Sequence, residues 1–255
     1  MIKINNKEFP YSFSQNRLYE DCPKKYFFRY HEGIQEPSNE NLELGSAIHK
    51  LLEVQWWNID EDSYYDIPSE TLAEAINAEK LIKERKGTMY LVQLMDELRE
   101  FFKNKQIHFC ECELFIDDCI CKIDVIYTDA TRPGKIILGD YKVTKNPKGP
   151  EDAIAEGQLL LYKLAFLESD HHCYLDPHDE IDVDDVLVEY INILPYASFN
   201  ILKPSGPMEI SGKTCATFYR CMEFNKVKIN NLEFPKKKKW CKWCYYKDMC
   251  DNLKE

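Results

Sequence analysis

The sequence predicts an α/β fold in which a mixed sheet is flanked by helices. Two observations carry this prediction. Helical patterns fill the N-terminal part of the chain as far as Lys103, and three strand-like apolar stretches follow before helix and strand patterns alternate again. Such alternation is typical of α/β folds. With 255 residues, of which 44% are hydrophobic, the chain has ample material for a buried core.

Four helical stretches precede the first strand. They are predicted at Ser12–Tyr30, Gly45–Trp57, Ser69–Lys86 and Thr88–Lys103. The pair Cys22-Pro23 predicts a break inside the first stretch, because proline cannot continue a hydrogen-bonded helix. On the second stretch, His49 and Glu53 share a face because they are four residues apart. Gly87 separates the last two helices as a C-cap.

The predicted strands are His108–Ile116, Cys119–Tyr127, Lys135–Val143 and Val186–Leu194. Asp117-Asp118 joins the first two as a hairpin. Its register pairs Cys112 with Ile123, Leu114 with Cys121 and Glu111 with Asp124. One face then carries Leu114, Ile123, Val125 and the four cysteines Cys110, Cys112, Cys119 and Cys121. Asp124 lies on the other face, alongside Glu111 and Glu113. We therefore interpret the four hairpin cysteines as packing residues.

The rest of the chain continues the alternation of helix and strand. Ala153–Ser169 predicts a helix with Gln158 and Tyr162 one turn apart, and the acidic loop Asp176–Asp185 leads to the last predicted strand. Thr214–Asn230 predicts a further helix. The sequence shows no repeat and no long linker. We therefore expect a single domain over residues 1–255.

The tripeptide Asp140-Tyr141-Lys142 closes an apolar run in the third predicted strand. Asp140 and Lys142 project to the same face, because side chains alternate along a strand. Asp124 lies in the strand before it. Carboxylates gathered at strand ends suit a hard divalent cation, and a lysine beside them suits an attacking water and the charge that develops. The trio predicts metal-dependent cleavage of phosphodiester bonds.

Three cysteines lie within ten residues near the C-terminal end: Cys241, Cys244 and Cys250. Three thiolates do not complete a tetrahedral site, so a fourth ligand must come from elsewhere. Cys22 is the best candidate, because its surroundings lack the strand pattern that buries the hairpin cysteines. Zinc and an iron–sulfur cluster both fit four thiolates, and the spacing does not decide between them. The aromatic residues around the cysteines favour a cluster shielded from water.

Composition excludes some classes of protein. A net charge of −11 argues against a general nucleic-acid coat protein, but it leaves room for a nuclease with a local basic channel. No apolar run reaches membrane-spanning length, and Met1–Pro10 lacks the apolar core of a signal peptide. Eleven cysteines without a secretion signal favour reduced thiols or metal ligands over disulfides. We expect a cytoplasmic protein without a membrane partner.

Six motifs follow one another along the chain. They are Ser12-Phe13-Ser14 through Tyr26, Gly45 through His49, Asp124, Asp140-Tyr141-Lys142, Gln158 with Tyr162, and Cys22 with Cys241, Cys244 and Cys250. In this order they resemble the RecB/AddB-type branch of the PD-(D/E)XK nucleases, which includes CRISPR-associated RecB-like exonucleases. The similarity runs nearly end to end. The sequence departs from the family at Ile123, before the first aspartate, and at Cys121, where the family frequently has glycine.

The resemblance implies a fold and an active site. The fold is a restriction-endonuclease-like core with a helical insertion at residues 58–106. The implied catalytic residues are Asp124, Asp140 and Lys142. The implied ligands of a Mg²⁺ or Mn²⁺ ion are His49, Asp124, Asp140 and the backbone carbonyl of Tyr141. Gln158 and Tyr162 would touch the scissile phosphate or a flanking base; the alternative is a helix face packed on the sheet.

The resemblance also implies a [4Fe–4S] cluster that joins residue 22 to segment 241–250, with Cys22, Cys241, Cys244 and Cys250 as its ligands. Two further side-chain roles stay open. Glu53 either orients His49 or is solvated. The run Lys236–Lys239 either follows a DNA backbone or forms a solvated linker.

The expected function is a metal-dependent DNA exonuclease that acts on single-stranded or end-resected DNA in recombination, repair or CRISPR adaptation. The sequence contains no G-x-x-x-x-G-K-[ST] motif, so a helicase or integrase partner would be a separate protein. One alternative is a non-catalytic DNA-end-binding partner of such a protein on the same fold. Another is a zinc-stabilised interaction module.

Overall fold

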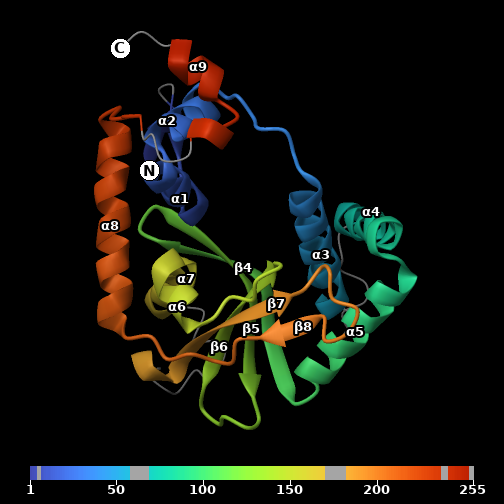
Figure 1. The fold of residues 1–255 in the computed structure, drawn as a ribbon. Coiled ribbons are helices and arrows are strands. Elements are labelled where there is room, and N and C mark those ends of the chain that lie inside the picture. Colours follow the sequence, from blue (N-terminus) through green and yellow to red (C-terminus); the bar gives the residue numbers. More distant parts are fainter. Residues whose placement is uncertain (5–6, 58–68, 170–181, 237–240, 253–255) are drawn as a thin grey trace.

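The computed structural model describes residues 1–4, 7–57, 69–169, 182–236 and 241–252. Within them, helices cover both faces of a mixed six-stranded sheet (Figure 1). This arrangement confirms the predicted α/β fold with a central mixed sheet flanked by helices. None of the described helices is both long and apolar enough to cross a bilayer.

The sheet contains β3 (Tyr11–Ser12), β4 (Lys105–Ile116), β5 (Cys119–Asp129), β6 (Ile136–Val143), β7 (Val186–Ile193) and β8 (Leu202–Pro204). Its order is β3-β5-β6-β7-β8, with β4 paired to β5. The pairs β3/β5 and β6/β7 are parallel, and the others are antiparallel. A separate pair joins β1 (Ile2–Ile4) to β2 (Lys7–Phe9). The four predicted strands correspond to β4, β5, β6 and β7. The others were not expected, because two or three residues show no readable alternation.

The two edges of β5 have different partners. β4 pairs with one edge along the length of the strand. On the other edge, β3 pairs with Cys119 and Ile120, while β6 pairs with the stretch from Val125 to Thr128. A strand has only two hydrogen-bonding edges, so β3 and β6 share one and leave a fork between them. Asp124 lies at this fork.

The hairpin of β4 and β5 has the predicted register at two pairs: Cys112 with Ile123, and Leu114 with Cys121. Glu111 departs from regular strand geometry with a φ of 51°, in the left-handed region. The alternation of side chains is interrupted there. Cys110 belongs to the core on the opposite face of the sheet from Cys112, and so does Val125, its partner on β5. The prediction that all four hairpin cysteines share a face with Val125 is therefore wrong for Cys110 and for Val125 itself.

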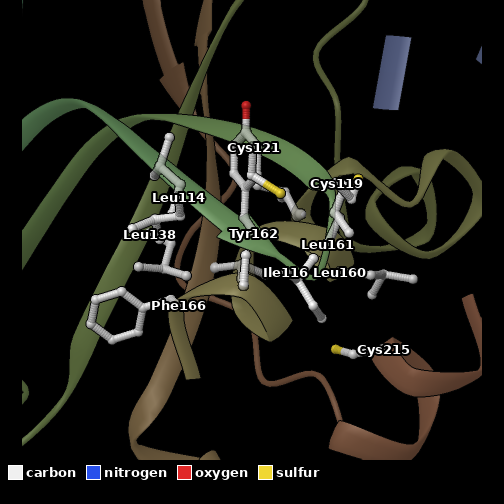
Figure 2. Packing of buried hydrophobic residues seen from close by; sticks show 14 of the residues in the cluster. Leu114, Ile116, Cys119, Cys121, Leu138, Leu160, Leu161, Tyr162, Phe166 and Cys215 are labelled. Carbon is white, nitrogen blue, oxygen red and sulfur yellow. The ribbon is translucent and has the colours of Figure 1, made fainter. Parts of the chain in front are cut away.

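The first core lies between one face of the sheet and helices α1 (Phe13–Asp21), α7 (Gln158–Glu168) and α8 (Gly212–Asn230). Figure 2 shows part of it, with Cys121 of β5 beside Tyr162 of α7, and Phe166 of α7 near Leu138 of β6. α7 packs on both the sheet and α8, which explains why most of its residues are buried.

The predicted helix Ala153–Ser169 is in fact two helices, α6 (Pro150–Glu156) and α7. Gly157 separates them with a φ of 84°. A Cβ atom at this position would overlap the ring of Phe218. The left-handed backbone and the close ring together require glycine. The break makes Gln158 the first residue of α7.

The second core lies between the other face of the sheet and helices α3 (Glu40–Trp57), α4 (Ser69–Lys86) and α5 (Thr88–Phe102). α4 has the predicted bounds, whereas α3 begins at Glu40 rather than Gly45. α4 and α5 occupy the stretch predicted as a helical insertion, although β4 already begins at Lys105. Residues 58–68 of that stretch lie outside the described residues.

The N-terminal and C-terminal segments pack on each other at one end of the molecule (Figure 1). α1 is followed by α2 (Pro23–Tyr26), with the predicted break at Cys22-Pro23, and by a π-helical turn. At the other end of the chain, a short turn at Cys241–Trp243 leads to α9 (Lys247–Asn252). The Tyr246 hydroxyl donates to the Ile34 carbonyl at 2.6 Å, and its ring stacks on Phe28.

Candidate active site

The fork between β5 and β6 places Asp124 and Asp140 close together. The ladder between the two strands ends at the pair Val125–Gly139, and both aspartates lie one residue beyond it. The Tyr141 amide donates to Asp124 Oδ2 at 2.7 Å. A side-chain oxygen thus takes the place of a ladder bond at the point where the strands separate.

Gly139 allows the close approach of the two strands just before the fork. A Cβ atom there would lie 2.7 Å from Val125 Cγ1 and 3.1 Å from Ile191 Cδ1. Real Cβ atoms do not approach other carbons as closely as 2.7 Å, so any other residue would force the side chain of Val125 or β6 itself to shift. Gly139 therefore helps to set the position of the neighbouring Asp140.

Asp140 and Lys142 share a face of β6, as predicted. Lys142 Nζ lies 2.7 Å from Asp140 Oδ2, and it donates to Gln158 Oε1 at 2.8 Å. Asp140 is only 1% exposed. The ion pair is thus buried, and a buried charge pair needs further hydrogen bonds to be tolerated.

Gln158 and Tyr162 on α7 supply those bonds. Gln158 Nε2 donates to the Tyr162 hydroxyl at 2.7 Å, and that hydroxyl donates to Asp140 Oδ1 at 3.4 Å. Asp140, Lys142, Gln158 and Tyr162 form a closed network of side chains. Its contacts place Gln158 and Tyr162 behind the acid–lysine pair, where they hold its geometry; a contact with substrate stays a prediction.

His49 of α3 faces Asp124 from the helical side of the fork. Its Nδ1 lies 3.6 Å from Asp124 Oδ2, and its ring meets Tyr141 edge-on. Glu111 of β4 completes the group: ligand atoms of His49, Glu111 and Asp124 all lie within 4.8 Å of one another. Sequence reasoning placed Glu111 beside Asp124 but gave it no role. The signal was the hairpin pairing of the two acids.

The donor set fits a hard divalent cation. It combines carboxylates with one imidazole, a mixture that suits Mg²⁺ or Mn²⁺ rather than a thiolate-seeking metal. Asp140 Oδ2 accepts no hydrogen bond of good geometry from the described residues, so its lone pairs are directed only toward Lys142. Asp124 and Asp140 thus retain capacity for a cation. The role of the Tyr141 carbonyl stays a prediction.

Electrostatics favour a cation at this place. Burial raises the pKa of Asp140 to about 6; Lys142 opposes the rise, and Asp124 adds to it. Burial also raises the pKa of Glu111, against the effect of Lys122. For His49, burial lowers the pKa, but contact with Asp124 and the charges of Asp140 and Glu111 outweigh it, so the pKa is raised. Each direction reflects excess negative charge held out of water.

A cavity of about 490 Å³ opens beside this group. His49, Glu111, Tyr141 and Lys142 line it, together with Lys50 and Lys122. Lys122 Nζ lies 2.5 Å from Glu111 Oε2. Glu53 is paired with Lys50 Nζ at 2.8 Å, which is neither of the two roles considered for it. The side chains of Lys50, Lys122 and Lys142 thus place positive charge at the edge of an acidic centre.

A second site forms where the two ends of the chain meet. Cys22, Cys241, Cys244 and Cys250 line one small cavity, and so do Lys24, Lys25, Lys236 and Lys247. The structure thus brings together four cysteines that are far apart in the sequence. Burial raises the pKa of Cys244 and of Cys250, and the neighbouring Cys22 raises both further. A bound positive centre would favour loss of the protons of Cys244 and Cys250.

The other cysteines have different surroundings. Cys112, Cys119, Cys121 and Cys215 are buried in the first core, as expected of small apolar side chains. Cys221 is exposed on α8. Of the lysine run, Lys236 pairs with Asp251 at 2.5 Å, and residues 237–239 lie outside the described part of the chain.

Comparisons with known proteins bear on these two sites. No curated protein matches the chain. Similar solved structures include a "putative exonuclease" from Eubacterium rectale, with 14% identity and a TM-score of 0.49 over 98% of this chain and 91% of that one. They also include SSO0001, with 16% identity and a TM-score of 0.31 over 86% of this chain and 90% of that one. Neither likeness is strong enough to indicate a function.

The comparison with protein families is decisive. The family model described as the PD-(D/E)XK nuclease superfamily matches residues 10–251. The matched region includes both carboxylates at the fork, Lys142, His49 and all four cysteines of the second site. The chain therefore belongs to the PD-(D/E)XK nuclease superfamily.

Proposed function

We propose that the chain is a Mg²⁺- or Mn²⁺-dependent deoxyribonuclease, an exonuclease that hydrolyses single-stranded or end-resected DNA. The supporting observation is the fork between β5 and β6. There, His49, Glu111 and Asp124 converge from three elements, and Asp140, which pairs with Lys142, lies one residue past the end of the ladder. A complete set of carboxylates with a paired lysine favours catalysis over a non-catalytic DNA-end-binding role.

Each side chain has a distinct task in this proposal. Asp124 and Asp140 hold the cation, with His49 and Glu111 as further ligands. When bound, the cation polarises a phosphoryl oxygen and acidifies water. Lys142, fixed by Gln158, orients the attacking water and places its positive charge against the phosphate in the transition state.

We further propose that the cysteine site holds a structural [4Fe–4S] cluster. Cys22, Cys241, Cys244 and Cys250 line one cavity, so the two ends of the chain together supply the four thiolates that such a cluster takes. The four lysines around the cavity suit a group that carries several thiolates.

Hydrolysis of end-labelled DNA tests the main proposal. Single-stranded and double-stranded substrates are incubated with Mg²⁺ or Mn²⁺ and with wild type or Lys142→Ala. Lys135→Ala is a matched control, because it removes an acid–lysine pair with Asp185 on the surface. We expect cleavage by wild type and the control, and loss of at least a hundredfold in Lys142→Ala. Undiminished cleavage by Lys142→Ala would refute the assignment.

A further inference from the structure

The loop between β7 and β8 carries two exposed aromatic rings. Tyr196 is 58% exposed and Phe199 is 80% exposed. In Figure 1 this loop runs beside α3 at the end of the sheet where β6 also ends. Exposed aromatic rings are surfaces on which nucleic-acid bases can stack.

Two lysines from different elements meet at the ring of Tyr196. Lys86, at the end of α4, holds its ammonium 4.0 Å from the ring centroid. Lys145, in the segment after β6, holds its ammonium 4.6 Å from the same centroid. Within the described residues, neither lysine forms an ion pair with a carboxylate. In an acidic chain, this is a local concentration of unpaired positive charge.

This group of three residues is joined to the active-site cavity. The Tyr196 hydroxyl donates to Asn41 Oδ1 at 2.8 Å, and Asn41 lines the cavity together with His49 and Lys142. Lys145 follows Lys142 by three residues. Three residues of chain span at most about 10 Å, so the two lysines lie within about three base steps of about 3.4 Å. A nucleic-acid strand that occupies the cavity can therefore reach Tyr196.

The loop is anchored to α5 on both sides of Tyr196. The Leu194 carbonyl accepts from the Tyr90 hydroxyl at 3.5 Å, and the Leu202 amide donates to Glu97 Oε2 at 2.7 Å. Leu194 and Ile201 also share a backbone hydrogen bond of 2.8 Å across the base of the loop. The ring is thus presented from a fixed position, which reduces the entropy lost when a ligand binds.

We propose that Tyr196, Lys86 and Lys145 form a binding site for single-stranded nucleic acid next to the catalytic centre. A base stacks on Tyr196, and the two ammonium groups contact the phosphates on either side of it. The inference rests on the proposed nuclease function, for which it names the strand-binding surface.

A base that stacks on Tyr196 displaces two lysines from the ring. Each lysine loses a weak cation–π contact, which the stacking contact and the new phosphate contacts replace. A lysine that leaves the ring gains a phosphate contact and releases a counterion. A paired base in a duplex offers no free face, so the site discriminates in favour of single strands.

Binding of a fluorescent 20-mer of thymidine, measured by anisotropy in EDTA, tests the role of Tyr196. EDTA prevents hydrolysis, so the wild-type protein can be used. Tyr196→Ala is expected to weaken binding roughly tenfold to a hundredfold, while Tyr196→Phe retains most of it. Phe224→Ala is the matched control, because Lys228 lies 4.3 Å over that ring on α8, behind the opposite face of the sheet.

The salt dependence of the same binding tests the two lysines. A double variant, Lys86→Gln with Lys145→Gln, should reduce the slope of log K against log salt by about 1.4, or about 0.7 for each lost phosphate contact. Lys228→Gln should leave the slope unchanged. An unaltered slope in the double variant, or wild type that fails to bind at low salt, would overturn the proposal. Equal weakening of binding to a 20-base-pair duplex in Tyr196→Ala would also overturn it.

The two proposals can fail separately. If wild type cleaves DNA but Tyr196→Ala binds the 20-mer like wild type, the strand site is refuted and the nuclease assignment stands. If Tyr196→Ala loses binding but wild type cleaves no DNA with either cation, the nuclease assignment is refuted. The site then stands as a single-strand binding surface on an inactive fold.

Discussion

Asp140 holds a buried charge that folding alone does not favour. Burial raises its pKa from 3.8 to about 6, and Asp124 adds to this effect against the attraction of Lys142. A carboxyl group whose pKa is higher in the folded state binds its proton more tightly there than in the unfolded chain. Its effect on stability is most favourable below pH 4 and is lost as the pH rises through about 6. A bound cation would reverse this loss.

Substitution of Asp140 should therefore change how stability depends on pH. In EDTA, wild type should lose about 1–2 kcal/mol relative to Asp140→Asn between pH 5 and pH 7.5, because only wild type ionises this group. Urea unfolding at the two pH values measures the difference. Asp96→Asn, at an exposed acid on α5, serves as control. Parallel pH profiles for wild type and Asp140→Asn would show that Asp140 is not perturbed in this way.

Glu111 is the residue whose role the sequence did not reveal. We expect Glu111→Gln to raise the Mn²⁺ concentration for half-maximal DNA cleavage at least about tenfold, because a carboxylate near the cation is lost. Glu113→Gln removes an exposed acid two residues further along the same strand and should have no effect. A titration of cleavage rate against Mn²⁺ compares the two. Equal midpoints would exclude Glu111 as a ligand.

The individual site residues differed in how readily the sequence revealed them. Asp140 and Lys142 follow from strand alternation, and their predicted contact is present. His49 could be selected only through the resemblance, since a helix histidine has many uses. The hairpin pairing placed Glu111 beside Asp124, but no sequence pattern predicts its left-handed backbone within a strand.

At the scale of elements, the site depends on the separation of β5 from β6. β3 takes one part of the β5 edge and β6 takes the other, which leaves Asp124 with a free edge. The hairpin and β6 were predictable from apolar runs and turn residues. The fork was not, because β3 has two residues and pairs with a strand more than 100 residues away.

Gly139 offers a test of the fork. Gly139→Ala introduces a Cβ atom 2.7 Å from Val125 Cγ1, and we expect the contact to shift β6 and Asp140 with it. We expect a loss of about 1–3 kcal/mol of stability and a larger proportional loss of DNA cleavage. Gly149→Ala is the control, since its Cβ atom would meet nothing within 4 Å. Thermal unfolding and cleavage are measured together; wild-type values for both would contradict the role of Gly139.

Gly157 explains why one predicted helix is two. The sequence shows no break within Ala153–Ser169, although α6 buries only Ala153 whereas most of α7 is buried. The ring of Phe218 and a left-handed backbone impose the glycine, and both are tertiary facts. The consequence is functional, because Gln158 begins α7 beside Lys142.

At the scale of the whole molecule, the two ends of the chain are held together. Tyr246 joins α9 to the segment after α2, and four cysteines from both ends face one cavity. Order of secondary structure and fold class were predictable from hydrophobic patterns. The contact between the two ends was predicted only from the resemblance and from the need of three clustered cysteines for a fourth ligand. No local pattern specifies contacts between residues so far apart in the sequence.

Loss of one cysteine should loosen both ends. For protein purified without oxygen, Cys244→Ala is expected to lose iron and sulfide and to unfold several degrees lower, because the loop closed by the site is long. Cys221→Ala, at an exposed cysteine of α8, should keep full iron content and the same unfolding temperature. Wild-type iron, sulfide and unfolding temperature in Cys244→Ala would argue against a cluster that joins the two ends of the chain. Stoichiometric zinc in wild type would show that the site holds zinc instead of an iron–sulfur cluster.

The central claim is that the fork between β5 and β6 holds a divalent cation. Calorimetric titration of Mn²⁺ into the protein tests it without DNA and without reference to catalysis. Wild type should bind Mn²⁺ with release of protons near pH 6, where Asp140 is partly protonated. Asp124→Asn should bind Mn²⁺ at least tenfold more weakly. Binding by Asp124→Asn that equals wild type, or none by wild type, would contradict the account.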